Sequence, residues 1–115
     1  MTQARRVLGA RGEDAVVVWY EDRGYRIVDR NWRCRDGELD VVACRDDVVV
    51  FCEVKTRSSS AFGAPVEAVT WRKQQRLRHL ARLWLMARDA APLGGMRFDV
   101  ASVLAGRIEI VEDAF

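Results

Sequence analysis

Two short stretches of this sequence are the most informative about its fold: Gly-Glu-Leu-Asp at residues 37–40, and Phe-Cys-Glu-Val-Lys-Thr-Arg at residues 51–57. The run at residues 48–51 is β-branched and aromatic, which is typical of a strand inside a sheet. Glu53 and Lys55 interrupt this strand pattern, and buried charges need a partner or a metal ion. Because strand side chains alternate between faces, Glu53 and Lys55 share one face of the predicted sheet.

The preceding strand brings carboxylates to the same place, because Glu38 and Asp40 also share a face. Two carboxylates and an ammonium at a strand edge predict a divalent-metal site that handles phosphate. Mg²⁺ and Mn²⁺ prefer oxygen ligands and leave positions for water and a phosphate oxygen. We expect Asp40 and Glu53 to be metal ligands, together with the main-chain carbonyl of Val54. Lys55 would then face the phosphate and neutralise charge in the transition state.

A structural role is the alternative for the same residues. Asp40, Glu53 and Lys55 could form an ion-pair network on a half-exposed sheet face, because strand carboxylates are often only solvated or paired. The residue types alone leave both interpretations open.

Length and composition fit one domain over residues 1–115, with a single hydrophobic core. The chain is 50% hydrophobic and 31% charged, which argues against wholesale disorder. No apolar run approaches the roughly 20 residues that span a bilayer, and the N-terminus lacks the apolar core of a signal peptide. We therefore expect a cytoplasmic protein without membrane contact. The three cysteines have no CxxC spacing, so they predict neither a zinc site nor a disulfide framework.

The hydrophobic pattern predicts helices and strands in the order α-β-β-β-α-β-β. A small, polar loop over residues 58–63 is expected to cover a ligand. The expected elements are a helix over 8–23, a strand over 25–28, a hairpin of strands over 39–43 and 48–54, a helix from about residue 65 to the break at 92–95, and strands over 97–103 and 107–111.

The net charge is only +2, but its distribution favours a nucleic-acid partner. Residues 71–88 contain seven basic side chains and no acidic one. Such asymmetry can attract a phosphate backbone, although a basic helical face is usually just a solvated face. Two tryptophans, Trp32 and Trp71, could stack on unpaired bases or pack in the core. The candidate nucleic-acid-binding residues on this helix are Arg72, Lys73, Arg76 and Arg82.

Further short motifs extend this pattern over nearly the whole chain. They are Gly9-x-x-Gly12-Glu13, Asn31-Trp32-Arg33, Gly37-Glu38-Leu39-Asp40, Phe51-x-Glu53-Val54-Lys55-x-Arg57 and Phe98-Asp99-Val100. Taken together they resemble the bacterial YraN-like family of uncharacterised proteins, which is related to Holliday-junction resolvases. Asp40 with Glu53-Val54-Lys55 is similar to the motif of the PD-(D/E)XK nuclease superfamily. Leu39 stands where that motif often has Pro.

The resemblance implies a restriction-endonuclease-like fold, with a mixed β-sheet flanked by helices. It also implies that an acid on the first helix completes the metal site, and that acid would be Glu13. A solvated acid favoured by the helix dipole is the alternative for Glu13. Arg57 lies on the Lys55 face, where it could clamp a phosphate or pair with Glu38.

The leading hypothesis is therefore an endodeoxyribonuclease that depends on Mg²⁺ or Mn²⁺ and acts on branched or otherwise structured DNA. One alternative is a catalytically inactive nucleic-acid-binding module with the same fold. Another is a structural adaptor that binds neither metal nor DNA. Because resolvases cut symmetric junctions as dimers, the resemblance leaves a homodimer open.

Overall fold

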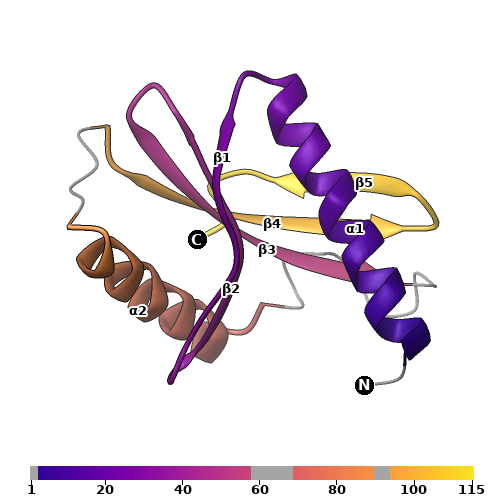
Figure 1. Ribbon diagram of the computed structural model, residues 1–115, viewed down its shortest axis with the longest axis horizontal. Helices are drawn as coiled ribbons and strands as arrows, with labels where there is room; N and C mark the ends of the chain where they lie inside the picture. Colours follow the sequence, from indigo (N-terminus) through magenta and orange to yellow (C-terminus); the bar gives the residue numbers. More distant parts are fainter. Residues whose placement is uncertain (1–2, 58–68, 90–93) are drawn as a thin grey trace.

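The observed elements follow the expected order α-β-β-β-α-β-β (Figure 1). The computed structural model describes residues 3–57, 69–89 and 94–115, and describes side chains from residue 11 onward. The helices are α1 (Gln3–Asp22) and α2 (Trp71–Ala87), and the strands are β1 (Arg26–Cys34), β2 (Gly37–Arg45), β3 (Val48–Arg57), β4 (Met96–Leu104) and β5 (Arg107–Val111). The expected α/β class is confirmed.

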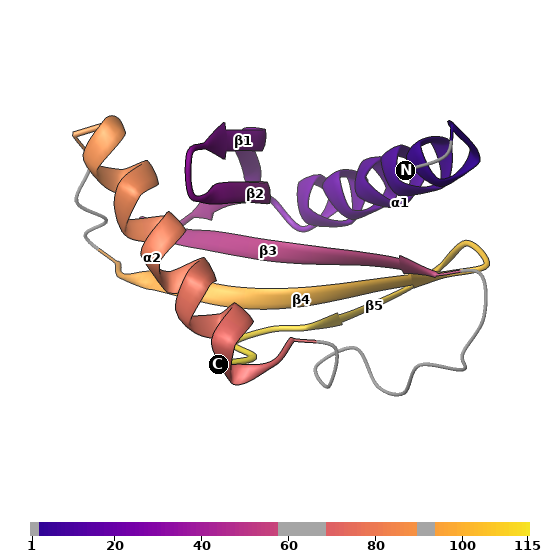
Figure 2. The ribbon, with the colours of Figure 1, turned by 90° about the horizontal axis from the view of Figure 1, so that it is seen from below.

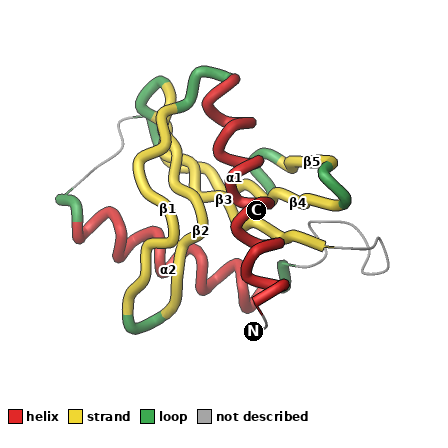
Figure 3. Tube along the Cα trace, turned by 45° about the vertical axis from the view of Figure 1, so that its right-hand side comes forward, coloured by secondary structure: helices red, strands yellow, loops and turns green. Residues whose placement is uncertain are grey.

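The strands form one mixed sheet in the order β1-β2-β3-β4-β5. Only β3 and β4 run parallel, and α2 lies in the long connection between them, as a parallel pair requires. Figures 1 and 3 show the strands between the two helices, and Figure 2 shows α2 crossing β3 and β4. Within the described residues, no helix is both long and apolar enough to cross a membrane.

The β2–β3 hairpin is confirmed, and its turn has a clear physical basis. Asp46 and Asp47 both have positive φ, 53° and 65°. A two-residue turn of this kind matches the twist of the flanking strands, and Asp tolerates the left-handed conformation better than most residues. The polar turn expected between these strands is therefore the turn that joins them.

The three largest differences from the expected element boundaries concern α1, β1 and α2. Helix α1 begins at Gln3 and not at residue 8, and β1 continues beyond residue 28 to Cys34, because it remains paired with β2. Edge strands are half exposed, so β1 lacks the apolar signal on which the prediction relied. Helix α2 begins at Trp71, because the Thr70 side chain accepts a hydrogen bond from the Lys73 amide and caps it. The start expected near residue 65, and the loop over 58–63, lie outside the described residues.

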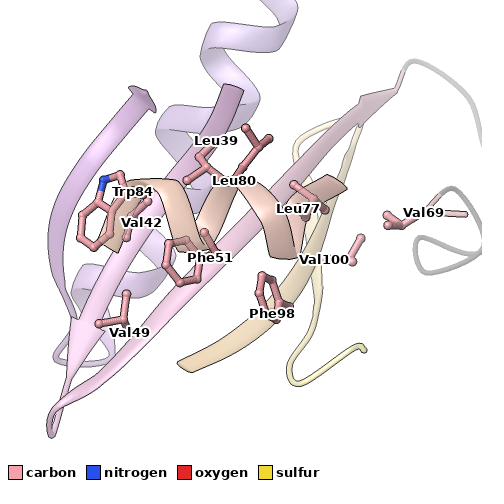
Figure 4. Close-up of a cluster of buried hydrophobic side chains, with 11 residues drawn as sticks. Leu39, Val42, Val49, Phe51, Val69, Leu77, Leu80, Trp84, Phe98 and Val100 are labelled. Carbon is pink, nitrogen blue, oxygen red and sulfur yellow. The ribbon is translucent and has the colours of Figure 1, made fainter. Parts of the chain in front are cut away.

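One face of the sheet packs against α2. Figure 4 shows the side chains from β2, β3, β4 and α2 that meet there. Leu80 and Trp84 are 1% and 2% exposed, and the Trp84 ring meets Phe51 edge-on at 5.7 Å. The buried members of this cluster are Leu39, Val42, Val49, Phe51, Val69, Leu77, Leu80, Ala81, Trp84, Phe98 and Val100.

The opposite face packs against α1 and contains a buried polar network. Asp99 on β4 is completely buried, yet its carboxylate has several donors. It accepts hydrogen bonds from the Tyr20 hydroxyl (2.6 Å), from Arg97 Nε and a terminal nitrogen of the Arg97 guanidinium (2.8 and 2.9 Å), and from the Asp113 amide (3.0 Å). Burial raises the pKa of the Tyr20 hydroxyl, so Tyr20 stays a donor. This network joins α1 to β4 and to the C-terminal segment.

We predict that Tyr20→Phe lowers the free energy of unfolding by about 1–3 kcal/mol, because it removes one donor from a buried carboxylate. Urea denaturation at neutral pH measures the change. Val18→Ala is the control on the same helix, because Val18 is 53% exposed and should change stability by less than about 0.5 kcal/mol. Equal stability of Tyr20→Phe and the parent would mean that the other donors satisfy Asp99 alone.

Candidate functional site

The candidate site lies where β2 and β3 separate. Their ladder runs from the Arg45–Val48 pair to the Val41–Cys52 pair and stops before Asp40. Beyond that point β2 continues to pair with β1, while β3 continues to pair with β4. The β1–β2 hairpin therefore leaves the plane of the sheet.

A side chain replaces the main-chain acceptor at this fork. The amide of Val54 donates a hydrogen bond of 2.9 Å to Asp40 Oδ2. A partly buried amide needs an acceptor, and the Asp40 carboxylate provides it where the ladder has ended. This bond holds Asp40 beside Glu53, as the sequence pattern predicted.

The hairpin tip reaches α2 and encloses a cavity of about 190 Å³. His79 Nε2 on α2 lies 2.9 Å from Asp36 Oδ2 at the tip. Gly37 has a φ of 143°, and a Cβ there would lie 3.3 Å from the Leu80 side chain, so the close approach favours glycine. Acidic side chains from the strands, basic side chains from α2 and an apolar floor line the cavity: Gly37, Glu38, Asp40, Glu53, Lys73, Arg76, Leu77 and Leu80.

Asp40 occupies an electrostatically unfavourable position. Burial, and then the charge of Glu53, raise the pKa of Asp40 from 3.8 to about 7. The hydrogen bond from Val54 lowers this pKa, while Glu38 and Glu13 raise it further. A cation placed between these carboxylates would relieve the repulsion. The site is thus acidic on its strand side.

Three cations lie against this acidic group. Lys55 Nζ is 3.3 Å from Glu53 Oε1, and the two side chains are 23% and 19% exposed. The charge of Lys55, and then burial, lower the pKa of Lys73, so these two ammonium groups are close neighbours. Arg76 contributes to the same effect and lines the cavity. This concentration of positive charge suits an anionic group such as phosphate.

Glu13 lies at the edge of the site and is held by β1. Its Oε1 accepts hydrogen bonds from Asn31 Nδ2 at 2.8 Å and from Arg30 Nε at 3.3 Å. Its side chain is 12% exposed. A Cβ at Gly12 would collide with the Thr56 side chain, so α1 approaches β3 closely at this glycine. Arg30 and Asn31 could not be predicted from the sequence as partners of Glu13, because residues 17 and 18 positions away carry no local signal of contact.

The other predicted residues are more dispersed. Arg72 and Arg82 are exposed on α2 and do not line the cavity, and Arg57 ends β3. Glu38 is ion-paired with Arg33 on β1, whose Nε lies 2.9 Å from Glu38 Oε2.

The two tryptophans differ in exposure. Trp71 is 73% exposed, so core packing is wrong for this residue. Trp32 is half-buried and packs against the α2-side cluster, so core packing holds there.

These residues fit an ion that is shared with water and phosphate. In the described part of the chain, no three Asp, Glu, His or Cys side chains form a group arranged to hold a metal ion. Mg²⁺ is usually bound through one or two carboxylates plus waters and substrate phosphates, and Asp40 with Glu53 supplies that smaller set. Glu13 and the Val54 carbonyl as further ligands stay predictions.

The raised pKa of Asp40 predicts a measurable pH effect. Between about pH 4 and pH 7 the folded protein binds more protons than the unfolded chain, so stability falls as the pH rises through this range. Asp40→Asn keeps an acceptor for the Val54 amide and does not ionise. Without metal, its stability relative to the parent should increase from pH 5 to pH 8 by up to about 3 kcal/mol, at about 1.4 kcal/mol per pKa unit.

Urea denaturation in a chelator measures these stabilities. Asp46→Asn is the matched control, because the Asp46 side chain is 90% exposed. Parallel pH profiles for Asp40→Asn and the parent would contradict the raised pKa.

Comparison with known proteins gives the relationships of the chain. Residues 12–103 match the uncharacterised protein family UPF0102. A UPF0102 protein of Nocardia farcinica is 51% identical over 87% of this chain and 78% of its own length. Relatives with the same description occur in Streptomyces griseus, at 47% identity over 90% of this chain and 87% of the relative, and in Moorella thermoacetica, at 45% over the whole of both. The expected family resemblance is confirmed, and the chain belongs to the uncharacterised protein family UPF0102.

Proposed function

We propose that this protein is an endonuclease that depends on Mg²⁺ or Mn²⁺ and hydrolyses phosphodiester bonds in DNA. One observation carries the proposal: the Val54 amide holds the Asp40 carboxylate beside Glu53, in a cavity whose other wall is basic. Hydrolysis of a phosphodiester needs a cation on the phosphate oxygens and positive charge around the transition state. The two carboxylates would bind that cation, and the nearby ammonium groups supply the further positive charge.

Each residue has a distinct role in this proposal. Asp40 and Glu53 would hold the metal ion, which when bound supplies charge stabilisation and a more acidic water. Lys55 releases its ion pair with Glu53 and turns its ammonium toward the scissile phosphate. Lys73 and Arg76 bind the anionic backbone at the cavity mouth.

The wider features extend the proposal to a substrate and a location. The exposed Arg72 and Arg82 continue the positive surface along α2, and Arg57 lies at the end of the strand that carries Lys55. Branched or structured DNA is the proposed substrate, and a homodimer would place two sites on a symmetric junction. Bacterial DNA lies in the cytoplasm, so the proposed place of action is cytoplasmic.

A second candidate is a nucleic-acid-binding module without turnover. Two observations favour it: Glu53 is already ion-paired with Lys55, and no three-ligand metal group occurs within residues 11–57, 69–89 and 94–115. Both candidates predict binding to DNA. Only the nuclease predicts metal-dependent cleavage.

The deciding experiment is a cleavage assay with Mg²⁺ and Mn²⁺ on junction, flap, single-stranded and duplex DNA. We expect cleavage that disappears in a chelator and in Asp40→Asn and Glu53→Gln, because each variant removes one ligand charge. Mn²⁺ titration by calorimetry should show weaker binding to both variants. Asp46→Asn is again the control and should cut normally. Binding of all four substrates with no cleavage under either metal would favour the binding module.

Lys55→Met separates catalysis from binding. The variant keeps much of the apolar stem but removes the ammonium, so cleavage should slow by about a hundredfold or more. Metal affinity should be unchanged or tighter, because a competing cation is gone. Lys73→Met is the matched comparison. It should weaken DNA binding more than it slows the cleavage of DNA that is already bound. Single-turnover rates at saturating protein measure the difference. Parental rates in Lys55→Met would make Lys55 only a structural partner of Glu53.

A further inference from the structure

Trp71 is unusual among the aromatic side chains of this chain. It is 73% exposed, whereas every other aromatic side chain in the described ranges is buried or half-buried. Trp84 on the same helix shows the contrast, because it is 2% exposed and its indole nitrogen donates to Asp29. The nuclease site described above uses no aromatic group, so the exposed indole has no role in it.

The indole stands on a helix without negative charge. Helix α2 contains five Lys and Arg residues and no Asp or Glu. Arg72, His79 and Arg82 are exposed on it, away from its buried stripe. An acidic polymer is therefore the complementary partner for this surface, and an aromatic platform among cations suits one whose units have a flat, apolar face.

Trp71 is also close to the cavity. It shares the first turn of α2 with Lys73, which lines the cavity and lies beside Lys55. Two residues advance about 3 Å along a helix that is about 10–12 Å wide with its side chains. A nucleic-acid strand advances about 3.4 Å per nucleotide. Half the circumference of such a helix is about 16–19 Å, so roughly five nucleotides would lead from a phosphate in the cavity around the helix to the indole.

We propose that Trp71 stacks on an unpaired base of a single DNA strand whose backbone follows the basic surface of α2 into the cavity. A paired base inside a duplex is covered on both faces, whereas an unpaired base can lay one face on an indole. Trp71 thus selects single-stranded segments, such as those in flaps and open junctions. This inference rests on the proposed function only where it places a phosphate in the cavity. The stacking of a base on Trp71 does not depend on that function.

The test compares two ligands with equal charge and different bases. One is a ten-nucleotide oligothymidine, and the other is a ten-unit abasic strand with the same phosphates. Binding of each to the full chain is measured by fluorescence anisotropy in a chelator, so no cleavage can occur. The parent should bind the thymidine strand about tenfold more tightly, within the range for one base on one aromatic side chain. Trp71→Leu should remove this preference and leave the abasic affinity unchanged.

Met86→Ala is the control variant, because Met86 is an equally exposed apolar residue at the other end of α2, at 76%. It should keep the parental preference. The proposal is overturned if the parent binds both strands equally, or if Trp71→Leu keeps the preference. It is also overturned if Trp71→Leu weakens both strands alike, or if the parent self-associates through Trp71 in sedimentation.

Failure of this inference is distinct from failure of the nuclease. Asp40→Asn should lose cleavage and keep the base preference, because its carboxylate does not contribute to stacking. If the protein prefers the thymidine strand through Trp71 but cleaves no DNA, the nuclease proposal fails and the stacking proposal stands. If the protein cleaves DNA but binds both strands equally, the stacking proposal fails and the nuclease proposal stands.

Discussion

The hydrogen bond between the Val54 amide and the Asp40 carboxylate is the interaction on which the candidate site depends. It closes the β2–β3 ladder with a side chain instead of a carbonyl. Because the ladder ends there, the β1–β2 hairpin can bend away from β3 and touch α2 through Gly37 and Asp36. The cavity depends on this divergence, because the hairpin and β3 supply its acidic side chains and α2 supplies its basic and apolar ones.

Two carboxylates of this protein, Asp99 and Asp40, have opposite electrostatic surroundings. Asp99 is completely buried, and donors from Tyr20, Arg97 and Asp113 surround it. Asp40 has the Val54 amide but also has Glu53 as a neighbour, and the pKa of Asp40 rises to about 7. A buried carboxylate whose oxygens accept hydrogen bonds stabilises the fold. A carboxylate that lies beside another carboxylate instead favours the binding of a cation, because the cation reduces their repulsion.

The positive groups are arranged in two zones with different relations to the acids. Lys55, Lys73 and Arg76 are close to the carboxylates, so their charges are coupled to the site. Arg72 and Arg82 are exposed farther along the surface of α2 and lie outside the cavity lining. A reacting phosphate fits the first zone and a bound strand fits the second. The two proposed functions, nuclease and binding module, share both zones and differ in whether the bound DNA is cleaved.

The sequence alone was enough to predict the element order, the β2–β3 hairpin and the shared face of Glu53 and Lys55. These follow from local rules: alternation along a strand, polar turns and helical spacing. It also indicated Asp40 beside Glu53, because a short hairpin brings neighbouring strands together. Helix α2 was predicted with the wrong start, since Thr70 was not identified as its cap, and β1 was too short because an edge strand has little apolar signal.

The remaining features follow from contacts between elements that are far apart in the chain. Three contacts join residues that are distant in the sequence: the hydrogen bond of Val54 to Asp40, the contact of the hairpin tip with α2, and the hydrogen bonds of Arg30 and Asn31 to Glu13. The exposure of Trp71 also depends on how α2 turns on the sheet, which helical spacing leaves open for a residue in the first turn. The physical reason is the same in each case: local patterns fix the direction of a side chain on its own element, whereas packing between elements fixes what that side chain meets.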